Sequence, residues 1–138
     1  MKKILFLIVC VAALFSCSDN NTSNKNPNIP NYSVNAYLNT TLPLYNNLKF
    51  VSNPVFVPNE GAKGLIVMKT GEGTYNAFDA ACPNQAFNSC VAMTIDGINA
   101  VCSCDKSAYN LFTGLGGLEY PMKQYRVEFS GTVVHVYN

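Results

Sequence analysis

Four cysteines in the second half of the chain constrain its fold more than any other feature. Cys82 and Cys90 lie in one predicted loop, and Cys102 and Cys104 lie in a second. Between the loops, the segment 94–101 carries an Asp-Gly dipeptide flanked by alternating apolar residues, a pattern typical of a β-hairpin with a two-residue turn. Such a hairpin would bring the loops side by side and gather four thiols at one end of a small β domain.

A set of cysteines like this is compatible with several kinds of chemistry. Structural disulfides, iron–sulfur ligands, zinc ligands and redox pairs all use cysteine sulfur. The Cys102-Ser103-Cys104 spacing differs from the Cys-x-x-Cys typical of thiol–disulfide oxidoreductases, and no helix start is predicted there to lower a thiolate pKa. The redox hypothesis is therefore the weakest on spacing alone, and the other three stay open.

The rest of the domain is predicted to consist of short strands separated by turns. The segment 32–38 alternates and would bury Val34, Ala36 and Leu38 on one face, while the apolar run 64–68 predicts a fully buried strand. No segment shows sustained helical periodicity, so an all-β sandwich or small barrel is expected. Further strands or extended pieces are predicted at 46–51, 54–58, 123–129 and 132–137, while the segment 75–80 leads into the first cysteine loop and 109–112 follows the second.

The two cysteine loops resemble those of the Rieske family, which binds a [2Fe–2S] cluster through two Cys and two His. By loop position, Cys82 and Cys102 match the cluster thiolates. Cys90 and Cys104 match the cysteines that form a disulfide in the cytochrome b–c type. The resemblance implies a Rieske-like small antiparallel β sandwich or barrel with a two-loop cysteine subdomain.

Other residues extend the resemblance over roughly the last half of the chain. Ser107 and Tyr109 match hydroxyl residues that hydrogen-bond to cluster sulfurs in the family. Downstream residues echo the family's Thr-Gly, Gly-Pro, Pro-Leu and later aromatic positions, namely Thr113-Gly114, Gly116-Gly117, Pro121-Met122 and Tyr125.

The chain departs from the family at both histidine positions. Asn84 stands at the first and Asp105 at the second, while the only histidine, His135, belongs to the last predicted strand and is expected on its solvent face. An Asn amide is a poor iron ligand, and an Asp carboxylate would change the charge of the site. A cluster held by two Cys and two His cannot form, so no cofactor is expected.

The emptied site leaves several states open for Cys82 and Cys102. A second disulfide between them is expected in an oxidising compartment, because the resemblance implies that their sulfurs lie close together. Two free thiols, or zinc bound by both sulfurs, Asp105 and water, are the alternatives. The loop residues Asn84, Asp105, Lys106 and Ser107 could form a small polar binding site or could satisfy loop backbone groups.

The N-terminus has the pattern of an exported lipoprotein. A basic start is followed by the apolar segment 4–15, and Leu14-Phe15-Ser16-Cys17 resembles a bacterial lipobox. We therefore predict a signal peptide at 1–16, a lipid-anchored flexible linker at 17–31 beginning with lipidated Cys17, and a Rieske-like domain at 32–138. The expected location is extracytoplasmic, on the outer membrane of a bacterium.

The net charge and the absence of known catalytic motifs argue against some classes of function. The formal net charge is +1 and no basic cluster is present, which argues against a nucleic-acid partner. No nucleophile–base pair or phosphate loop is apparent, so an enzyme is not expected. A binding or structural module of the cell envelope is the first hypothesis. Electron transfer through a [2Fe–2S] cluster with altered ligands is the alternative, and a thiol–disulfide partner is the third.

Overall fold

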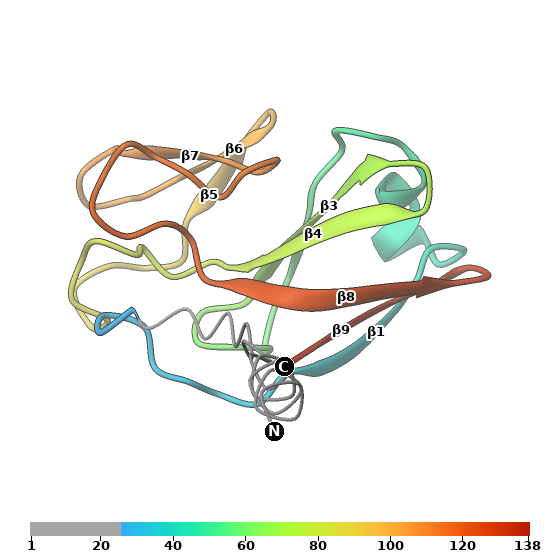
Figure 1. Cartoon of the computed structure of the whole chain (residues 1–138), viewed down its shortest axis with the longest axis horizontal. Coiled ribbons are helices and arrows are strands. Elements are labelled where there is room, and N and C mark those ends of the chain that lie inside the picture. The colour runs from blue at the N-terminus through green and yellow to red at the C-terminus, as the bar shows by residue number, and fades with distance from the viewer. Residues whose placement is uncertain (1–25) are drawn as a thin grey trace, which may run out of the picture.

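A computed structural model describes residues 26–138 of the chain (Figure 1). The predicted signal peptide, Cys17 and most of the predicted linker lie outside these residues. The described elements are nine strands and one short 3₁₀ helix: β1 (Asn35–Asn39), η2 (Pro43–Lys49), β2 (Val55–Val57), β3 (Leu65–Gly71), β4 (Thr74–Asp79), β5 (Thr94–Asp96), β6 (Asn99–Val101), β7 (Ala108–Asn110), β8 (Gln124–Ser130) and β9 (Val133–Tyr137). No helix within 26–138 is both long and apolar enough to span a bilayer.

The strands form two antiparallel sheets. The larger has six strands in the order β1-β9-β8-β4-β3-β2, and the smaller has three in the order β5-β6-β7. In Figure 1 the smaller sheet stands beyond one end of the strands of the larger. The predicted all-β antiparallel architecture is confirmed.

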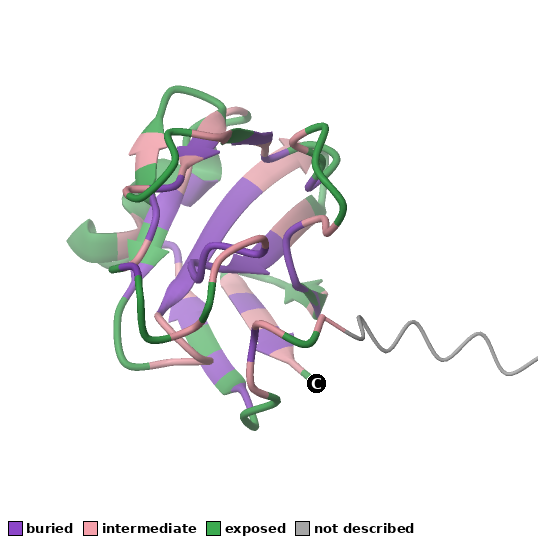
Figure 2. Ribbon diagram, turned by 90° about the vertical axis from the view of Figure 1, so that its left-hand side faces the viewer, coloured by how far each residue is buried: buried purple, intermediate pink, exposed green. Residues whose placement is uncertain are grey.

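The central strands of the large sheet are buried on both faces. Leu65 and Val67 of β3 point into a core to which all six strands and Leu48 of η2 contribute. Ile66 and Met68 point the other way, into a second core shared with the cysteine loops. This double burial explains why residues 64–68 form an uninterrupted apolar run, and Figure 2 shows buried residues along these strands.

The chain between β1 and β2 differs from the prediction. Residues 46–51 were expected to be extended, but 43–49 form the 3₁₀ helix η2, and Val51 makes only an isolated bridge to Lys69. Pro43 lies in the first turn of the helix, where its missing N–H removes no helical hydrogen bond. Leu48 is the one buried residue of the helix, so the segment carries no apolar periodicity to reveal it.

The predicted hairpin at 94–101 is present, but its turn lies one residue further along the chain. Asp96 pairs with Asn99, so Gly97 and Ile98 are the central residues and only Gly97 has a positive φ, of 59°. Glycine at the first central position is the pattern of a type II′ turn, whereas the Asp-Gly dipeptide indicated a type I′ turn.

The folded unit also begins earlier than residue 32. Ile29 is only 5% exposed. The Asn26 and Asn28 side-chain amides donate hydrogen bonds to the Pro83 carbonyl oxygen, at 2.8 and 3.0 Å. Residues 26–31 were assigned to the flexible linker, and the structure places them against the first cysteine loop instead.

Candidate functional site: the two-disulfide loop pair

The candidate site is formed by two loops that the small sheet holds together. The first loop, residues 80–93, runs from the end of β4 to β5. The second, residues 102–107, connects the adjacent strands β6 and β7. Cys82, Cys90 and Cys102 belong to the same apolar core, so the hairpin brings the loops together as the sequence predicted.

Two disulfides join the loops. Cys82 is bonded to Cys102 with a Cα–Cα distance of 5.5 Å, and Cys90 is bonded to Cys104 with a distance of 5.8 Å. Both distances fall in the range usual for disulfides. The pairing agrees with the expectation drawn from the resemblance, and it uses every cysteine of the described residues.

Asn84 crosslinks the first loop to the rest of the site. Its Nδ2 donates hydrogen bonds to the Tyr109 hydroxyl at 2.9 Å and to the Tyr120 carbonyl at 2.7 Å. Its Oδ1 accepts a hydrogen bond from the Tyr120 backbone N–H at 2.9 Å. All the polar atoms of the Asn84 side chain therefore contact the protein, as the backbone-satisfying hypothesis expects.

Asp105 organises the second loop and also reaches the first. Its carboxylate accepts hydrogen bonds from the Ser107 N–H at 2.9 Å, from the Ser107 hydroxyl at 2.5 Å and from Gln85 Nε2 at 2.7 Å. The hydrogen bonds from the Ser107 side chain and backbone, followed by that from Gln85, hold the pKa of the Asp105 carboxyl below its usual value. Lys106 adopts a positive φ of 62° between Asp105 and Ser107, which tightens this turn.

The hydroxyl groups of Ser107 and Tyr109 contact each other, and they also contact Asp105 and Asn84. The Ser107 hydroxyl donates to Asp105 and lies 3.3 Å from the Tyr109 oxygen. Tyr109 is fully buried, and its hydroxyl accepts the hydrogen bond from Asn84. These polar side chains thus form one hydrogen-bonded group that spans the two loops.

These residues do not fit a metal site in this arrangement. The sulfur atoms of Cys82, Cys90 and Cys102 lie within 4.8 Å of one another, but all three are in disulfides, whereas metals bind thiolates. Asp105, which the zinc hypothesis needed beside Cys82 and Cys102, is absent from that group, and Cys90 takes its place. The donor set suits neither a [2Fe–2S] cluster nor the zinc site considered from the sequence.

His135 lies outside the site, on the outer face of β9. Its ring stacks between Tyr37, at a centroid distance of 4.2 Å, and Tyr137, at 4.7 Å. Its Nε2 lies 2.8 Å from Asn35 Oδ1. Val134 and Val136 point into the core, so the expected outward orientation of His135 is confirmed, although the ring is half-buried by its neighbours.

Sequence reasoning missed the residue that anchors the first loop to the large sheet. Asp79, at the end of β4, is fully buried and accepts hydrogen bonds from the backbone N–H groups of Ala62, Lys63 and Ala81. It also accepts one from the Tyr125 hydroxyl at 2.8 Å. A single Asp at a strand end resembles any turn residue, so nothing local in the sequence distinguishes it.

The buried surroundings of Asp79 shift the pKa values of two neighbouring groups. Burial, with the adjacent Asp79 carboxylate, strongly raises the pKa of Tyr125. Burial lowers the pKa of Lys123, and Asp79 partly opposes that shift. Lys123 Nζ donates to the Pro30 carbonyl at 3.0 Å and to Asn31 Oδ1 at 2.9 Å, which fastens the segment 26–31 to β8 at its start.

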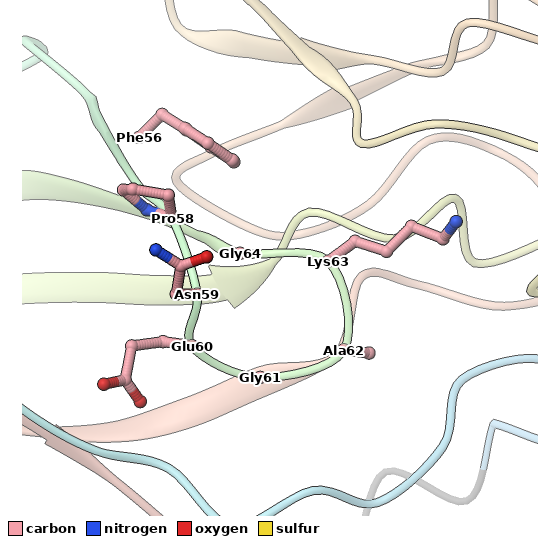
Figure 3. A pocket seen from close by; sticks show the side chains of 8 residues that line it. All are labelled: Phe56, Pro58, Asn59, Glu60, Gly61, Ala62, Lys63 and Gly64. Carbon is pink, nitrogen blue, oxygen red and sulfur yellow. The ribbon is translucent and has the colours of Figure 1, made fainter.

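A hollow of about 390 Å³ lies on the loop between β2 and β3 (Figure 3). It is lined by Phe56 and by residues 58–64. The side chains of Glu60 and Lys63 point in different directions in Figure 3, and Lys63 reaches the Cys90 carbonyl of the cysteine site instead. Because no polar groups converge in the hollow, it is not a candidate binding site.

Comparisons with known proteins do not assign a family to the chain. No protein-family model matches it, and no curated protein matches it significantly. The Rieske resemblance therefore rests only on the residues of the two loops and on those that follow them in the sequence.

Proposed function

We propose that the protein is a lipid-anchored, extracytoplasmic module of the bacterial envelope whose Rieske-like domain has no iron–sulfur cluster. The proposal rests on what the residues do at the four positions that hold iron ligands in the Rieske family. Cys82 and Cys102 are bonded to each other, and Asn84 and Asp105 are hydrogen-bonded within the loops. Each position that would bind iron in a Rieske protein instead crosslinks the protein to itself.

The crosslinks support a structural or binding role rather than catalysis. In a cluster-bearing domain the metal site ties one loop to the other, and here the Cys82–Cys102 disulfide makes that connection. Each disulfide contributes about 3 kcal/mol in the chain-entropy model, before any strain. The loop pair is thus a pre-organised surface whose shape does not depend on a cofactor.

Electron transfer through a cluster with altered ligands has less support. It would require breaking the Cys82–Cys102 disulfide and freeing Asn84 or Asp105 from the hydrogen bonds that now engage them. No sulfur among residues 26–138 remains as a free thiol to start such a site.

The proposed location rests on two separate observations. Two disulfides in a small domain indicate an oxidising, extracytoplasmic compartment. The lipid anchor rests on the sequence around Cys17. Replacing Cys17→Ala should move the protein from the membrane fraction to the soluble fraction, and unchanged partitioning would contradict the anchor.

The cluster-free state is tested by metal analysis of protein purified without air from its own envelope. Iron, acid-labile sulfide and the visible absorption spectrum are measured for the natural chain and for the Cys82→Ala/Cys102→Ala variant. We expect neither protein to contain stoichiometric iron or sulfide. Stoichiometric iron and sulfide in the natural chain, lost in the variant, would contradict the proposal and revive electron transfer.

A further inference from the structure

The two disulfides lie next to each other and differ in access to solvent. Cys82, Cys90 and Cys102 are 4%, 6% and 0% exposed, whereas Cys104 is exposed. The Cys90 sulfur lies within 4.8 Å of both sulfurs of the Cys82–Cys102 disulfide. The outer disulfide therefore has one end in solvent and its other end beside the inner disulfide.

We propose that these four cysteines form a thiol–disulfide relay, in which a dithiol reduces the Cys90–Cys104 disulfide at Cys104 and Cys90 then exchanges into the Cys82–Cys102 disulfide, so that one thiol is left at Cys104 and one at Cys82 or Cys102. The substrate class is a dithiol, either a small molecule or an exposed pair of cysteines in a protein. This activity goes beyond the structural role proposed above and does not require a metal or the lipid anchor.

The first step takes place at the exposed end. A thiolate of the dithiol attacks Cys104 Sγ and forms a mixed disulfide, while the Cys90–Cys104 bond breaks and its electron pair leaves on Cys90 Sγ. The second thiol of the dithiol then attacks its own sulfur in the mixed disulfide and releases Cys104 as a thiol. The dithiol leaves oxidised to a disulfide, and the protein has gained two electrons and two protons.

The second step takes place inside the loop pair. The Cys90 thiolate attacks the sulfur of Cys82 or Cys102, forms a new disulfide with it and expels the other sulfur as a thiolate, which takes up a proton. This exchange conserves electrons, so the product has one disulfide, between Cys90 and Cys82 or Cys102. It also has two thiols, one at Cys104 and one at the expelled cysteine.

Two polar groups lie near Cys90, whose burial in an apolar core would by itself disfavour the thiolate that the relay needs. The Ser89 hydroxyl donates to the Ala86 carbonyl at 2.6 Å and lies 3.5 Å from Cys90 Sγ, so it can turn from that carbonyl to the sulfur once the sulfur is negative. The Lys63 ammonium donates to the Cys90 carbonyl, so a positive charge lies beside the residue. Neither contact is visible in the spacing of the cysteines, so the sequence alone did not suggest redox chemistry.

Two variants that lack the same outer disulfide isolate the role of Cys90. Cys104→Ser leaves Cys90 as the free thiol, and Cys90→Ser leaves Cys104 as the free thiol. Each purified variant is held at mildly alkaline pH, quenched with acid, alkylated after denaturation and mapped by mass spectrometry without reduction. We expect alkyl label on Cys82 or Cys102 in Cys104→Ser, with Cys90 found in a disulfide, and label only on Cys104 in Cys90→Ser. Label confined to Cys90 in the first variant, or equal scrambling in both, would overturn the relay.

The natural chain provides a second test that does not depend on how the variants fold. It is treated with less than one equivalent of dithiothreitol, and the species that has gained two thiols is alkylated and mapped. The relay predicts label on Cys104 together with label on Cys82 or Cys102. Label restricted to Cys90 and Cys104, with the Cys82–Cys102 disulfide intact, would show that the electrons stop at the outer disulfide and would overturn the proposal.

Discussion

The large and small sheets of this protein are stabilised in different ways. All six strands of the large sheet contribute side chains to one apolar core, and its central strands are buried on both faces. The strands of the small sheet have three residues each, with at most one buried residue per strand. The small sheet adds only Ala100 and Tyr109 to the second core as buried residues, and its loops are also crosslinked by two disulfides and by the hydrogen bonds of Asn84 and Asp105.

The difference shows how loops can be held in place where a sheet offers little apolar packing. A three-stranded sheet this short buries too little apolar surface to hold long loops by packing alone. The large sheet therefore fixes the fold, and the crosslinks fix the loops.

The largest effect is expected at the residue that joins the two regions. Asp79→Ala removes the acceptor of four hydrogen bonds, which link Tyr125 of β8, the β2–β3 loop and Ala81 of the first cysteine loop. The free energy of unfolding should fall by about 3–5 kcal/mol, because buried N–H groups lose their partner. Urea denaturation measures the change. The exposed Asp96 provides the control Asp96→Ala, and equal small losses in both variants would contradict the anchoring role of Asp79.

Removing the disulfides separately should affect the inner one more strongly. Cys82→Ala/Cys102→Ala should lower the free energy of unfolding by about 3 kcal/mol from chain entropy, plus the cost of a cavity in the second core. The Cys90–Cys104 disulfide closes a loop of similar length but has one exposed end. The free energy of unfolding should therefore fall less in Cys90→Ala/Cys104→Ala. Denaturation of both double variants decides the order. A larger loss for the outer pair would show that packing around Cys82–Cys102 contributes little.

A smaller effect is expected from the polar crosslink. Asn84→Ala removes the hydrogen bonds to Tyr109 and Tyr120 and should cost about 2 kcal/mol. Asn88→Ala, at an exposed position of the same loop, should cost little. Thermal unfolding of the two variants gives the comparison, and indistinguishable midpoints would mean that the disulfides alone hold the first loop.

The smallest effect is a pH dependence that reports on the large sheet. The pKa of Tyr125 is raised in the folded state, so folding favours its neutral form and this contribution is lost as the pH rises above the unfolded value of about 10. Tyr125→Phe should therefore reduce the loss of stability above that pH, while costing about 1 kcal/mol at neutral pH for the missing hydrogen bond to Asp79.

A second tyrosine serves as the control for this pH dependence. Tyr137 is hydrogen-bonded to Glu128 on the outer face of the sheet, and its pKa is also raised. Because Tyr137 is far less buried than Tyr125, Tyr137→Phe should alter the alkaline slope less. A larger change of slope in Tyr137→Phe would show that burial beside Asp79 is not the main cause.

Much of the fold follows from local patterns in the sequence. The alternation at Val34, Ala36 and Leu38 and the apolar run at 64–68 each indicated a strand whose burial is confirmed, and the hairpin at 94–101 is present with its turn shifted by one residue. β2 is an edge strand, which agrees with the prolines Pro54 and Pro58 on either side of it. These features depend on periodicity and turn chemistry, which short stretches of sequence contain.

The features that were missed depend on contacts between distant segments. No residue near Asp79 in the sequence indicates its hydrogen bonds to Ala62 and Tyr125. No residue near Asn26 or Ile29 indicates that this polar segment packs against Pro83. The candidate site was located by its cysteines, but the partners of Asn84 and Asp105 required the arrangement of the loops in space. Tertiary hydrogen bonds of this kind have no period and no fixed spacing.

Native-state hydrogen exchange with and without a reductant tests most directly whether the two sheets are held by different interactions. The protein is incubated with a phosphine reductant until both disulfides have opened, as shown by thiol counting, and the amides of each strand are followed by mass spectrometry. We predict that residues 80–110, including β5, β6 and β7, lose protection, while β1, β9, β8, β4 and β3 keep theirs. Loss of protection to the same extent in both sheets, or in neither, would contradict the account.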